Sequence, residues 1–359
     1  MFFRKYKPIP KNRVADSPTQ LYIELSTFCN LACRTCVRNS VVDFEPAHFS
    51  LELMGRLMDS IPRIKTLKRI VLLGYGEALC NPHINVFLES LSRTGIPLVL
   101  VTNGQLMTKA LIDLMTTLLV QEIFLSWDDY ESADKIRIGS DTSLIQAVIK
   151  DLKKKRQGDH PTIGLEIVAL KRNHHTINRI IKSFYESGGE RIIITNIFPY
   201  TDYMKDEILF TYKKTPKINL HKRIHKNTQK DNITIASQII GDICHCPFIE
   251  RGTLFITAQG DVVPCIELAH THKAWYFNAS RMHYQYTLGN ISNGHLHEIW
   301  NAEEFISFRD KFIYYDFPDC LNCLDPEMCY HRSVRGADCY QNQTPCGECL
   351  WARGAILCP

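Results

Sequence analysis

The sequence predicts an α/β fold built on a parallel β-sheet, and two features of the first 200 residues support this. Short runs rich in β-branched and aliphatic residues alternate with longer amphipathic segments, at intervals of about 30 residues. The apolar runs are nearly continuous rather than alternating, which is typical of strands covered on both faces. Six such strands joined by helical crossovers can form a partial TIM-like barrel or an open doubly wound sheet.

The expected elements follow from where these runs begin and end. The predicted strands cover residues 21–26, 69–74, 97–102, 122–127, 163–170 and 191–196. The predicted helices cover residues 49–61, 83–93, 107–118, 142–156 and 174–187.

Polar segments follow the predicted strands where each strand ends. A cysteine-rich loop follows the first strand, and the segments GYGE (74–77), TNGQ (102–105) and SWDD (126–129) follow the next three. Asn196 ends the sixth strand. Because parallel α/β folds assemble their sites at the carboxyl ends of the strands, we expect these segments to meet there.

The pattern changes after residue 200. A basic stretch, 213–230, contains seven Lys or Arg, two His and no acid, which indicates a solvated linker or an anion-facing surface. A hairpin is expected around Gly260 and Asp261, followed by irregular, cysteine-rich chain. The expected organisation is an N-terminal extension (1–18), a barrel domain (19–200), a linker (201–243) and a cysteine-rich domain (244–359).

Composition excludes some classes of partner. The net charge of +4 is mild, which does not indicate nucleic-acid binding. No apolar run is long enough to span a membrane, and the charged, proline-containing start does not resemble a signal peptide. We therefore expect a cytoplasmic protein without a membrane partner. In a reducing compartment, its 14 cysteines indicate metal binding or catalysis rather than disulfides.

The segment TFCNLACRTCVR places Cys29, Cys33 and Cys36 within eight positions. Structural zinc sites and ferredoxin-type clusters normally take four protein ligands, so three thiolates suggest a metal position left open. A structural zinc ion that recruits a distant fourth ligand such as Cys80 is the alternative. Burial as a structural thiol is the other interpretation of Cys80.

The three cysteines match the CxxxCxxC signature, and the chain resembles the radical S-adenosylmethionine (SAM) enzymes in this motif and its position. The resemblance implies a partial (β/α)6 barrel in which Cys29, Cys33 and Cys36 hold a catalytic 4Fe-4S cluster. The iron without a thiolate would chelate the amino and carboxylate groups of SAM, and reduction would cleave SAM to a 5′-deoxyadenosyl radical. Thr35 departs from the family, which often has an aromatic residue there for an adenine contact.

The same resemblance implies further cofactor-binding residues. GYGEAL is similar to the family's GGE motif, so Gly74, Gly76 and Glu77 are expected to contact the methionyl amino group. SWDD is similar to the strand-four segment that binds the ribose hydroxyls, which implicates Ser126 and Asp128. Asn103 and Glu166 are weaker candidates, because both can equally be polar groups of a turn or of the barrel interior.

The C-terminal cysteines resemble those of the SPASM extension, which carries up to two auxiliary 4Fe-4S clusters. Cys246, Gly260 and Cys265 match its opening element, and Cys320, Cys323 and Cys329 match its CxxCxxxxxC element. The next expected cysteine is replaced by Ser333. We expect Cys246 and Cys265 in one cluster and the other three in a second, with Cys244 the spare. The candidates to complete them are Cys339, Cys346, Cys349 and Cys358, and zinc bound by the CGEC segment is the alternative.

Over nearly its whole length the chain resembles the radical SAM/SPASM maturases that accompany tungsten-dependent oxidoreductases of the aldehyde ferredoxin oxidoreductase type. This implies an enzyme that acts on a tungsten-pterin cofactor or its host enzyme, with ferredoxin or flavodoxin as reductant. A peptide-modifying SPASM enzyme that forms thioether or carbon–carbon crosslinks is the alternative. A noncatalytic iron–sulfur electron carrier or zinc-bound scaffold is the alternative from another class.

Overall fold

The computed structural model describes residues 14–130, 135–212, 215–224, 232–241, 245–276, 279–323, 329 and 336–359. Its centre is a ten-stranded sheet in the order β14-β11-β10-β1-β2-β3-β4-β5-β6-β8. Cys244 and much of the predicted basic stretch lie outside the described residues.

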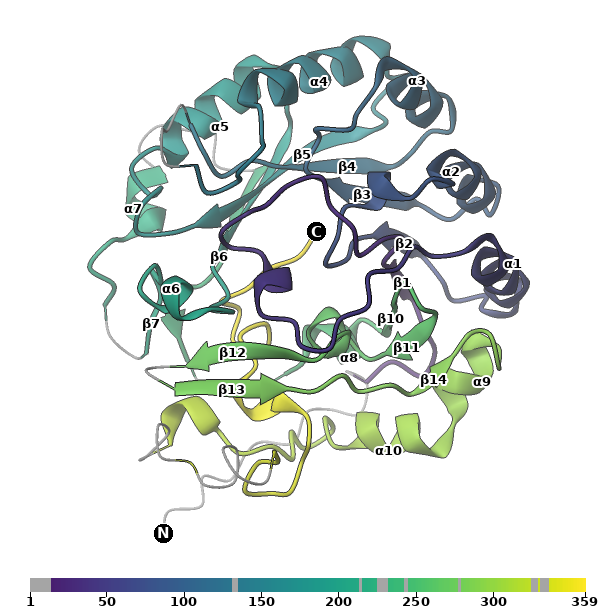
Figure 1. The fold of residues 1–359 in the computed structure, drawn as a ribbon, viewed down its shortest axis with the longest axis vertical. Helices are drawn as coiled ribbons and strands as arrows, with labels where there is room; N and C mark the ends of the chain where they lie inside the picture. The colour runs from purple at the N-terminus through teal and green to yellow at the C-terminus, as the bar shows by residue number, and fades with distance from the viewer. Residues whose placement is uncertain are drawn as a thin grey trace.

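The six predicted strands are confirmed as adjacent parallel strands in chain order. They are β1 (Gln20–Ile23), β2 (Arg69–Leu72), β3 (Leu98–Thr102), β4 (Glu122–Ser126), β5 (Thr162–Ala169) and β6 (Arg191–Asn196). The helices that connect them are α1 (Leu51–Ser60), α2 (Ile84–Ser92), α3 (Lys109–Thr117), α4 (Thr142–Lys155) and α5 (Ile177–Glu186). Figure 1 shows these helices on the outer side of the curved sheet, as in a partial (β/α)6 barrel.

Side-chain caps fix where several of these helices begin. The Ser50 hydroxyl accepts a hydrogen bond from the backbone N–H of Leu53 at the start of α1, and Thr108 does the same for Leu111 at the start of α3. The carboxylate of Asp141 caps α4 in the same way. Each cap satisfies a backbone donor that the first turn of a helix leaves without a partner.

The two faces of the strands build two different cores. Tyr22 is in register with Phe255 and Val71, and Val71 is in register with Val99, so these side chains share one face. They form the apolar cluster inside the barrel. The neighbouring residues Leu21 and Ile23 belong to the larger core beneath the helices.

Later segments of the chain extend this sheet at both ends. Strand β8 (Ile233–Ile235), from the predicted linker, pairs in parallel with β6. Strand β10 (Thr253–Ile256), from the cysteine-rich segment, pairs in parallel with β1. Strands β10 and β11 (Asp261–Val263) form the expected hairpin, and Gly260 adopts the left-handed φ of +87° in its turn. The cysteine-rich segment therefore shares a sheet with the barrel.

The remaining elements are short and surround the cysteine-rich half. The strands are β7 (Thr211–Tyr212), β9 (Ile239–Ile240), β12 (His272–Tyr276), β13 (Ala279–His283) and β14 (Gly289–Asn290). The helices are α6 (Asp202–Lys205), α7 (Leu220–Ile224), α8 (Pro247–Glu250), α9 (Leu296–Asn301) and α10 (Glu303–Asp310). Strands β12 and β13 form a separate antiparallel ribbon.

The chain's last residues cross the barrel between its terminal core strands. The backbone oxygen of Ala355 accepts a hydrogen bond from the Asn196 amide, and the backbone N–H of Leu357 donates to the hydroxyl of Thr195, both on β6. At the other end, the Tyr22 hydroxyl on β1 donates to the backbone oxygen of Pro359 at 3.0 Å. Figure 1 shows this segment ending in the space that the strands enclose. It bridges two strands that do not pair with each other.

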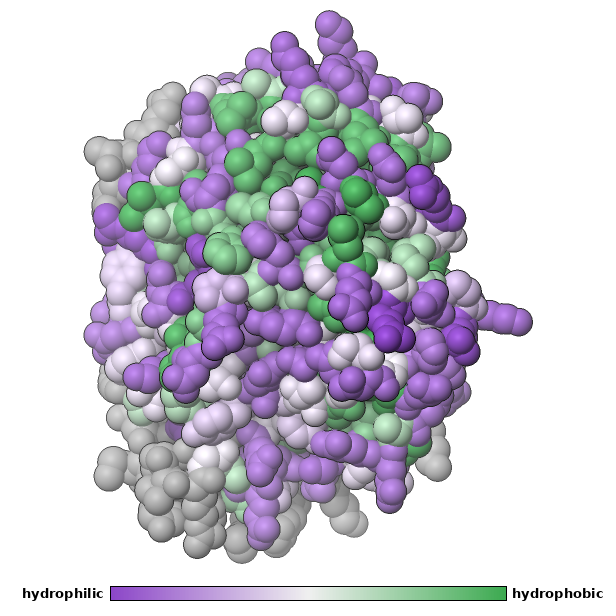
Figure 2. Space-filling model, turned by 45° about the vertical axis from the view of Figure 1, so that its right-hand side comes forward, coloured by the Kyte–Doolittle hydropathy of each residue, from purple (hydrophilic) through white to green (hydrophobic). Residues whose placement is uncertain are grey.

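Figure 2 shows the face that carries the first helices of the barrel, with apolar residues gathered in its upper half and polar residues over most of its lower half. Within the described part of the chain, no helix combines the length and apolar character needed to span a membrane.

Candidate functional site: a three-thiol loop and a four-thiol pocket

The loop after β1 carries Cys29, Cys33 and Cys36, and all three thiols are half-buried. Backbone hydrogen bonds hold this loop against the segment between β4 and α4, from Ala32 to Ile138 and from Arg34 to Ile136. The backbone N–H of Glu77 donates to the carbonyl of Phe28 at 2.8 Å, which ties the loop to the GYGE segment. Figure 1 shows the loop passing in front of the space enclosed by the strands.

The three thiols form one electrostatic group. Burial raises the pKa of the Cys33 thiol to about 11, opposed by Arg137 and reinforced by Cys36 and Cys29. Burial also raises the pKa of Cys29. The Arg38 guanidinium donates to the Cys36 sulfur at 3.4 Å, and its charge interacts with all three thiols. Arg38 and Arg137 thus favour the thiolates that a metal needs as ligands.

The spacing of the thiols does not fit a single zinc ion. Sulfur ligands of one tetrahedral zinc lie about 3.8 Å apart, because each Zn–S bond is about 2.3 Å. In the part of the chain that the structure describes, only Glu267, His272 and His283 bring three metal-ligand atoms within 4.8 Å of one another. At least one pair of the three sulfurs is therefore more than 4.8 Å apart, wider than two ligands of one zinc ion.

Cys80 lies close enough to this group for its charge to interact with Cys29, although burial is the main reason its pKa is raised. It ends the short 3₁₀ helix Ala78–Cys80 that follows GYGE. The backbone N–H of Asn30 donates to its sulfur. Its proximity makes Cys80 the residue to test as a fourth ligand.

The GYGE loop depends on its glycines for close backbone approach. A Cβ atom on Gly76 would lie 2.3 Å from the carbonyl oxygen of Ser26 and 2.5 Å from that of Phe28. A Cβ atom on Gly74 would lie 2.4 Å from the Cγ of Glu24. Only glycine allows this loop to lie directly on the cysteine loop.

Glu77 is buried and joins the second and third strand ends. Its Oε1 accepts hydrogen bonds from the Thr102 hydroxyl at 2.8 Å and the Leu79 N–H at 3.2 Å. Its Oε2 accepts from the Asn103 N–H at 2.8 Å. The Asn103 side chain in turn reaches the Cys29 sulfur at 3.7 Å and the Asn30 side chain at 2.9 Å. Burial raises the pKa of Glu77.

The ends of β4 and β5 carry a second charged group. Arg137 donates to Asp128 at 2.6 Å, and the backbone N–H of Val168 donates to the other carboxylate oxygen at 2.7 Å. Burial raises the pKa of Glu166 to about 7, while Arg137 opposes the rise. Arg137 also interacts with the Cys33 thiol, which places this group beside the cysteine loop. Ser126 is buried at the end of β4.

The structure brings Cys246, Cys265, Cys346 and Cys349 together around one small cavity of about 20 Å³. The rest of the lining is apolar: Phe248, Ile249, Pro264, Leu268, Phe308, Phe312, Tyr315 and Ala352. Burial raises the pKa of the Cys265 thiol, and the other three thiols add to the effect. We call these residues the four-thiol pocket.

A second set gathers near Cys339. Burial raises the pKa of its thiol, and Asp338 and the thiols of Cys329 and Cys323 contribute. Gly347 stands between the two cysteines of the CGEC segment. A Cβ atom on Gly347 would lie 3.0 Å from the Cys320 sulfur. Cys339 therefore lies near Cys323 and Cys329, whereas Cys320 lies beside the CGEC turn that carries Cys346 and Cys349.

Cys358 does not line the four-thiol pocket and lies in the segment that crosses the barrel. Its sulfur accepts a hydrogen bond from the indole N–H of Trp351 at 3.2 Å. Burial raises its pKa to about 12, and Glu166 adds to the rise.

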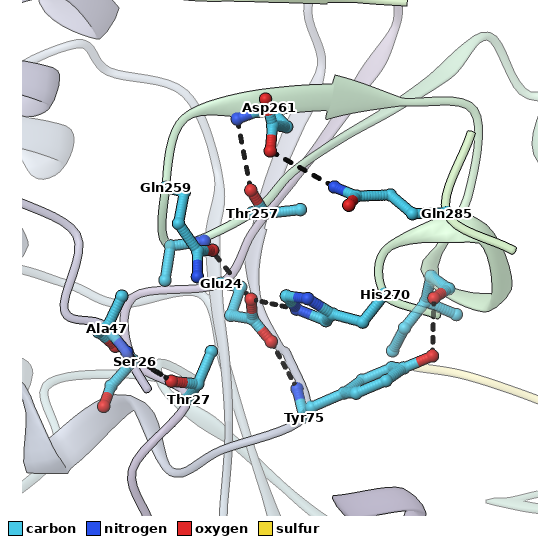
Figure 3. A network of polar contacts seen from close by, with 12 residues as sticks. Glu24, Ser26, Thr27, Ala47, Tyr75, Thr257, Gln259, Asp261, His270 and Gln285 are labelled. Carbon is cyan, nitrogen blue, oxygen red and sulfur yellow. Dashed lines mark hydrogen bonds and ion pairs between the residues drawn. The ribbon is translucent and has the colours of Figure 1, made fainter. Parts of the chain in front are cut away.

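Sequence reasoning does not identify Arg38 and Arg137 as part of the site, nor Glu24. Glu24 accepts hydrogen bonds from the N–H of Tyr75 at 2.8 Å and from His270 at 2.7 Å, as Figure 3 shows. These contacts join GYGE, the first strand and the cysteine-rich half. The contacts of Glu24 depend on residues distant in sequence, so no local pattern signals them, whereas Arg38 lies two residues from Cys36.

Comparison with known protein families gives two matches. The radical SAM superfamily profile matches residues 23–184, and the profile of the SPASM iron–sulfur cluster-binding domain matches residues 244–324. The first spans the cysteine loop and strands β2 to β5, and the second contains Cys246, Cys265, Cys320 and Cys323.

Two curated proteins are similar along most of the chain. The tungsten-containing aldehyde ferredoxin oxidoreductase cofactor-modifying protein of Pyrococcus furiosus is 27% identical over 347 residues, covering 94% of this chain and 96% of its own. The AdoMet-dependent heme synthase of Methanosarcina barkeri is 22% identical over 320 residues, covering 83% and 86%.

Solved structures share the fold. Streptococcus suis SuiB bound to S-adenosylmethionine superposes with a TM-score of 0.64 at 17% identity, covering 94% of this chain and 79% of its own. Native anSMEcpe with bound AdoMet gives a TM-score of 0.58 at 16% identity, covering 91% and 92%. The solved structures share only the fold, and the two matched profiles identify the chain as a radical SAM enzyme with a C-terminal SPASM domain.

Proposed function

We propose that Cys29, Cys33 and Cys36 hold a 4Fe-4S cluster with one iron open to SAM. The observation that carries this proposal is three half-buried thiols on the loop after β1, which interact electrostatically and of which at least one pair is more than 4.8 Å apart. When bound and reduced, such a cluster supplies the electron that cleaves SAM to a 5′-deoxyadenosyl radical.

The chain's own residues would bind and orient the cosubstrate. Glu77 Oε2 accepts a hydrogen bond from the Asn103 N–H, which leaves acceptor capacity for the methionyl amino group. Asp128, Arg137 and Glu166 form the charged group beside Cys33, where the nucleoside is proposed to lie. Because Asp128 is fully buried and bound to Arg137 and Val168, its role there is to position Arg137.

We propose that the four thiols of the pocket hold an auxiliary 4Fe-4S cluster. Four thiols converge on one cavity, matching the number of protein ligands a closed cluster takes. The apolar lining excludes water, which influences the reduction potential of a cluster. We propose Cys320, Cys323, Cys329 and Cys339 as ligands of a second auxiliary cluster, supported by the interaction of Cys339 with Cys329 and Cys323.

We further propose that the substrate is a tungsten-pterin cofactor or the oxidoreductase that contains it, with ferredoxin or flavodoxin as reductant. Support comes from the Pyrococcus furiosus cofactor-modifying protein, which matches across 94% of this chain. Deleting the gene should lower tungsten-pterin content and aldehyde oxidoreductase activity in the host. Unchanged values would remove this assignment without affecting SAM cleavage, and a peptide substrate would then be tested.

The direct test of SAM cleavage is 5′-deoxyadenosine formation. Protein reconstituted anaerobically with iron and sulfide, then reduced with dithionite, should form 5′-deoxyadenosine from SAM. The Cys33→Ala variant should form none. A cluster-loaded wild-type protein that neither binds SAM nor forms this product would instead be an electron carrier, and one with zinc in place of iron would be a scaffold.

A further inference from the structure

A buried cluster of Glu267, His272 and His283 lies outside the thiol sites. Glu267 is in the 3₁₀ helix Ile266–Leu268 that follows Cys265. His272 begins β12 and His283 ends β13, and the two are directly paired across this ribbon. The exposed fractions are 4% for Glu267, 0% for His272 and 1% for His283. We call these three residues the Glu–His–His cluster.

The polar atoms of the cluster converge on one carboxylate oxygen. Oε1 of Glu267 lies 3.1 Å from Nε2 of His272 and 2.5 Å from Nδ1 of His283. All three ligand atoms lie within 4.8 Å of one another. Two imidazoles and one carboxylate are a donor set suited to divalent first-row transition metals.

The other nitrogen of each imidazole has an acceptor of its own. Nδ1 of His272 lies 2.8 Å from the backbone oxygen of His270, which can only accept. Nε2 of His283 lies 3.2 Å from a carboxylate oxygen of Glu348, and Glu348 is paired with Arg281 at 3.4 Å. Histidines that bind metals usually donate their second N–H to a backbone carbonyl or a carboxylate in this way.

The His270 carbonyl fixes the proton of a neutral His272 on Nδ1, whereas His283 has a carboxylate oxygen at each nitrogen, Glu267 at Nδ1 and Glu348 at Nε2. If His272 donates through Nδ1 and His283 through Nε2, the two remaining nitrogens carry lone pairs. Both lone pairs then face the same oxygen of Glu267, itself an acceptor. Three acceptors directed at one another in a buried site require a cation among them, or one additional proton on each imidazole.

Glu267 provides a further observation. Its second oxygen, Oε2, is buried and has no hydrogen-bond partner among the described residues. A buried carboxylate oxygen without a donor is costly unless another positive group neutralises it. A metal ion bound by both oxygens of Glu267 would satisfy it.

We propose that the Glu–His–His cluster binds one divalent transition-metal ion, distinct from the thiol-bound clusters, through Glu267, Nε2 of His272 and Nδ1 of His283. All three ligands are buried, so the ion is structural. It joins the turn after Cys265 to the β12–β13 ribbon and, through Glu348, to the Cys346–Cys349 turn. The hydroxyl of Tyr75 lies 3.4 Å from Nδ1 of His272, which connects the same site to the GYGE loop.

Zinc is the probe for this site because it is redox-inert and separable from cluster iron. Cluster-loaded protein is incubated anaerobically with Zn²⁺, desalted and analysed for zinc and iron. One zinc per chain is expected. Its X-ray absorption spectrum should show nitrogen and oxygen ligands at about 2.0–2.1 Å, and no sulfur at the roughly 2.3 Å expected for zinc misplaced in a thiol site.

Variants then assign the zinc to these residues. His272→Gln and Glu267→Gln should each lose the zinc while iron content stays at the wild-type value. The matched control is His270→Gln, which removes a neighbouring buried imidazole that binds Glu24 but leaves the backbone oxygen in place, and it should retain zinc. Retained iron shows that a variant has folded, so each result is interpretable.

Wild-type protein that retains no zinc would overturn the proposal, as would a sulfur-coordinated zinc that persists in both variants. The cluster would then be a hydrogen-bonded pair of imidazolium ions. Neither result depends on SAM cleavage, so failure of this proposal is distinguishable from failure of the proposed function.

Discussion

The three-thiol loop and the four-thiol pocket hold cysteines in opposite environments. In the loop, Cys29, Cys33 and Cys36 are half-buried beside two arginines, and a charged group at the ends of β4 and β5 lies next to them. In the pocket, four thiols face a cavity whose other lining residues are apolar. One site is polar with three thiols, and the other is apolar with four.

This difference indicates a division of labour. A metal centre that must bind a charged cosubstrate needs an open position and polar groups to orient its ligand. A centre that only transfers electrons needs neither, and it benefits from a complete ligand set that excludes water. The pairing of β10 with β1 joins the segment that carries Cys246 and Cys265 to the strand before the three-thiol loop.

The largest expected effect tests whether the loop cluster has three cysteine ligands or four. Cys36→Ala should lose the catalytic cluster and form no 5′-deoxyadenosine, because an open cluster with two thiolates is not held. Cys80→Ala, at the nearby thiol, should retain the iron and stay within about threefold of the wild-type rate, since a change under about 0.65 kcal/mol is expected from a residue outside the ligand set. Product analysis of both variants checks this. Loss of iron in both would make Cys80 a fourth ligand.

The next largest expected effect is loss of iron from the four-thiol pocket while the three-thiol loop remains active. Cys349→Ala should lower the iron content by about four per chain, the content of one 4Fe-4S cluster. Cleavage of SAM with dithionite should persist, because the chemical reductant supplies the loop cluster directly. Iron analysis and 5′-deoxyadenosine measurement on the same sample test both statements, and abolished cleavage at full catalytic-cluster occupancy would contradict the division of labour.

The Arg137→Met variant tests whether the charged group at the ends of β4 and β5 depends on the buried Arg137–Asp128 ion pair. Arg137→Met leaves the Asp128 carboxylate buried without its cation, and breaking such a pair costs about 3–5 kcal/mol of unfolding free energy. Urea unfolding of the wild type and variant measures this loss. The double variant with Asp128→Asn should recover part of it, whereas an additive further loss would show that the pair is not coupled.

The smallest expected effect is a pH dependence from Glu166. Its pKa is about 7 in the folded chain against an ordinary 4.5, because of burial. Between these values the folded state keeps a proton that the unfolded state has lost, so stability is greatest at low pH and falls as the pH rises to about 7. The loss is about 3 kcal/mol at most. Glu166→Gln should remove this slope in unfolding measured between pH 5 and pH 8, and identical slopes would contradict the assignment.

The sequence predicts the barrel strands well because their apolar runs are long and buried on both faces. It also predicts the cysteine loop, since its three ligands are close in sequence. It leaves the partners of Cys246 and Cys265 open because Cys346 and Cys349 are about 80 to 100 residues away, and only the folded turn brings them together. Arg137 and the β1–β10 pairing escape sequence reasoning for the same reason, as neither leaves a periodic pattern.

The central claim is that the loop cluster has one iron position open to SAM. The most direct measurement is the EPR spectrum of dithionite-reduced, fully iron-loaded protein with and without SAM. The account predicts that SAM changes the signal of one cluster in the wild type and in Cys349→Ala. Identical spectra with and without SAM would contradict it.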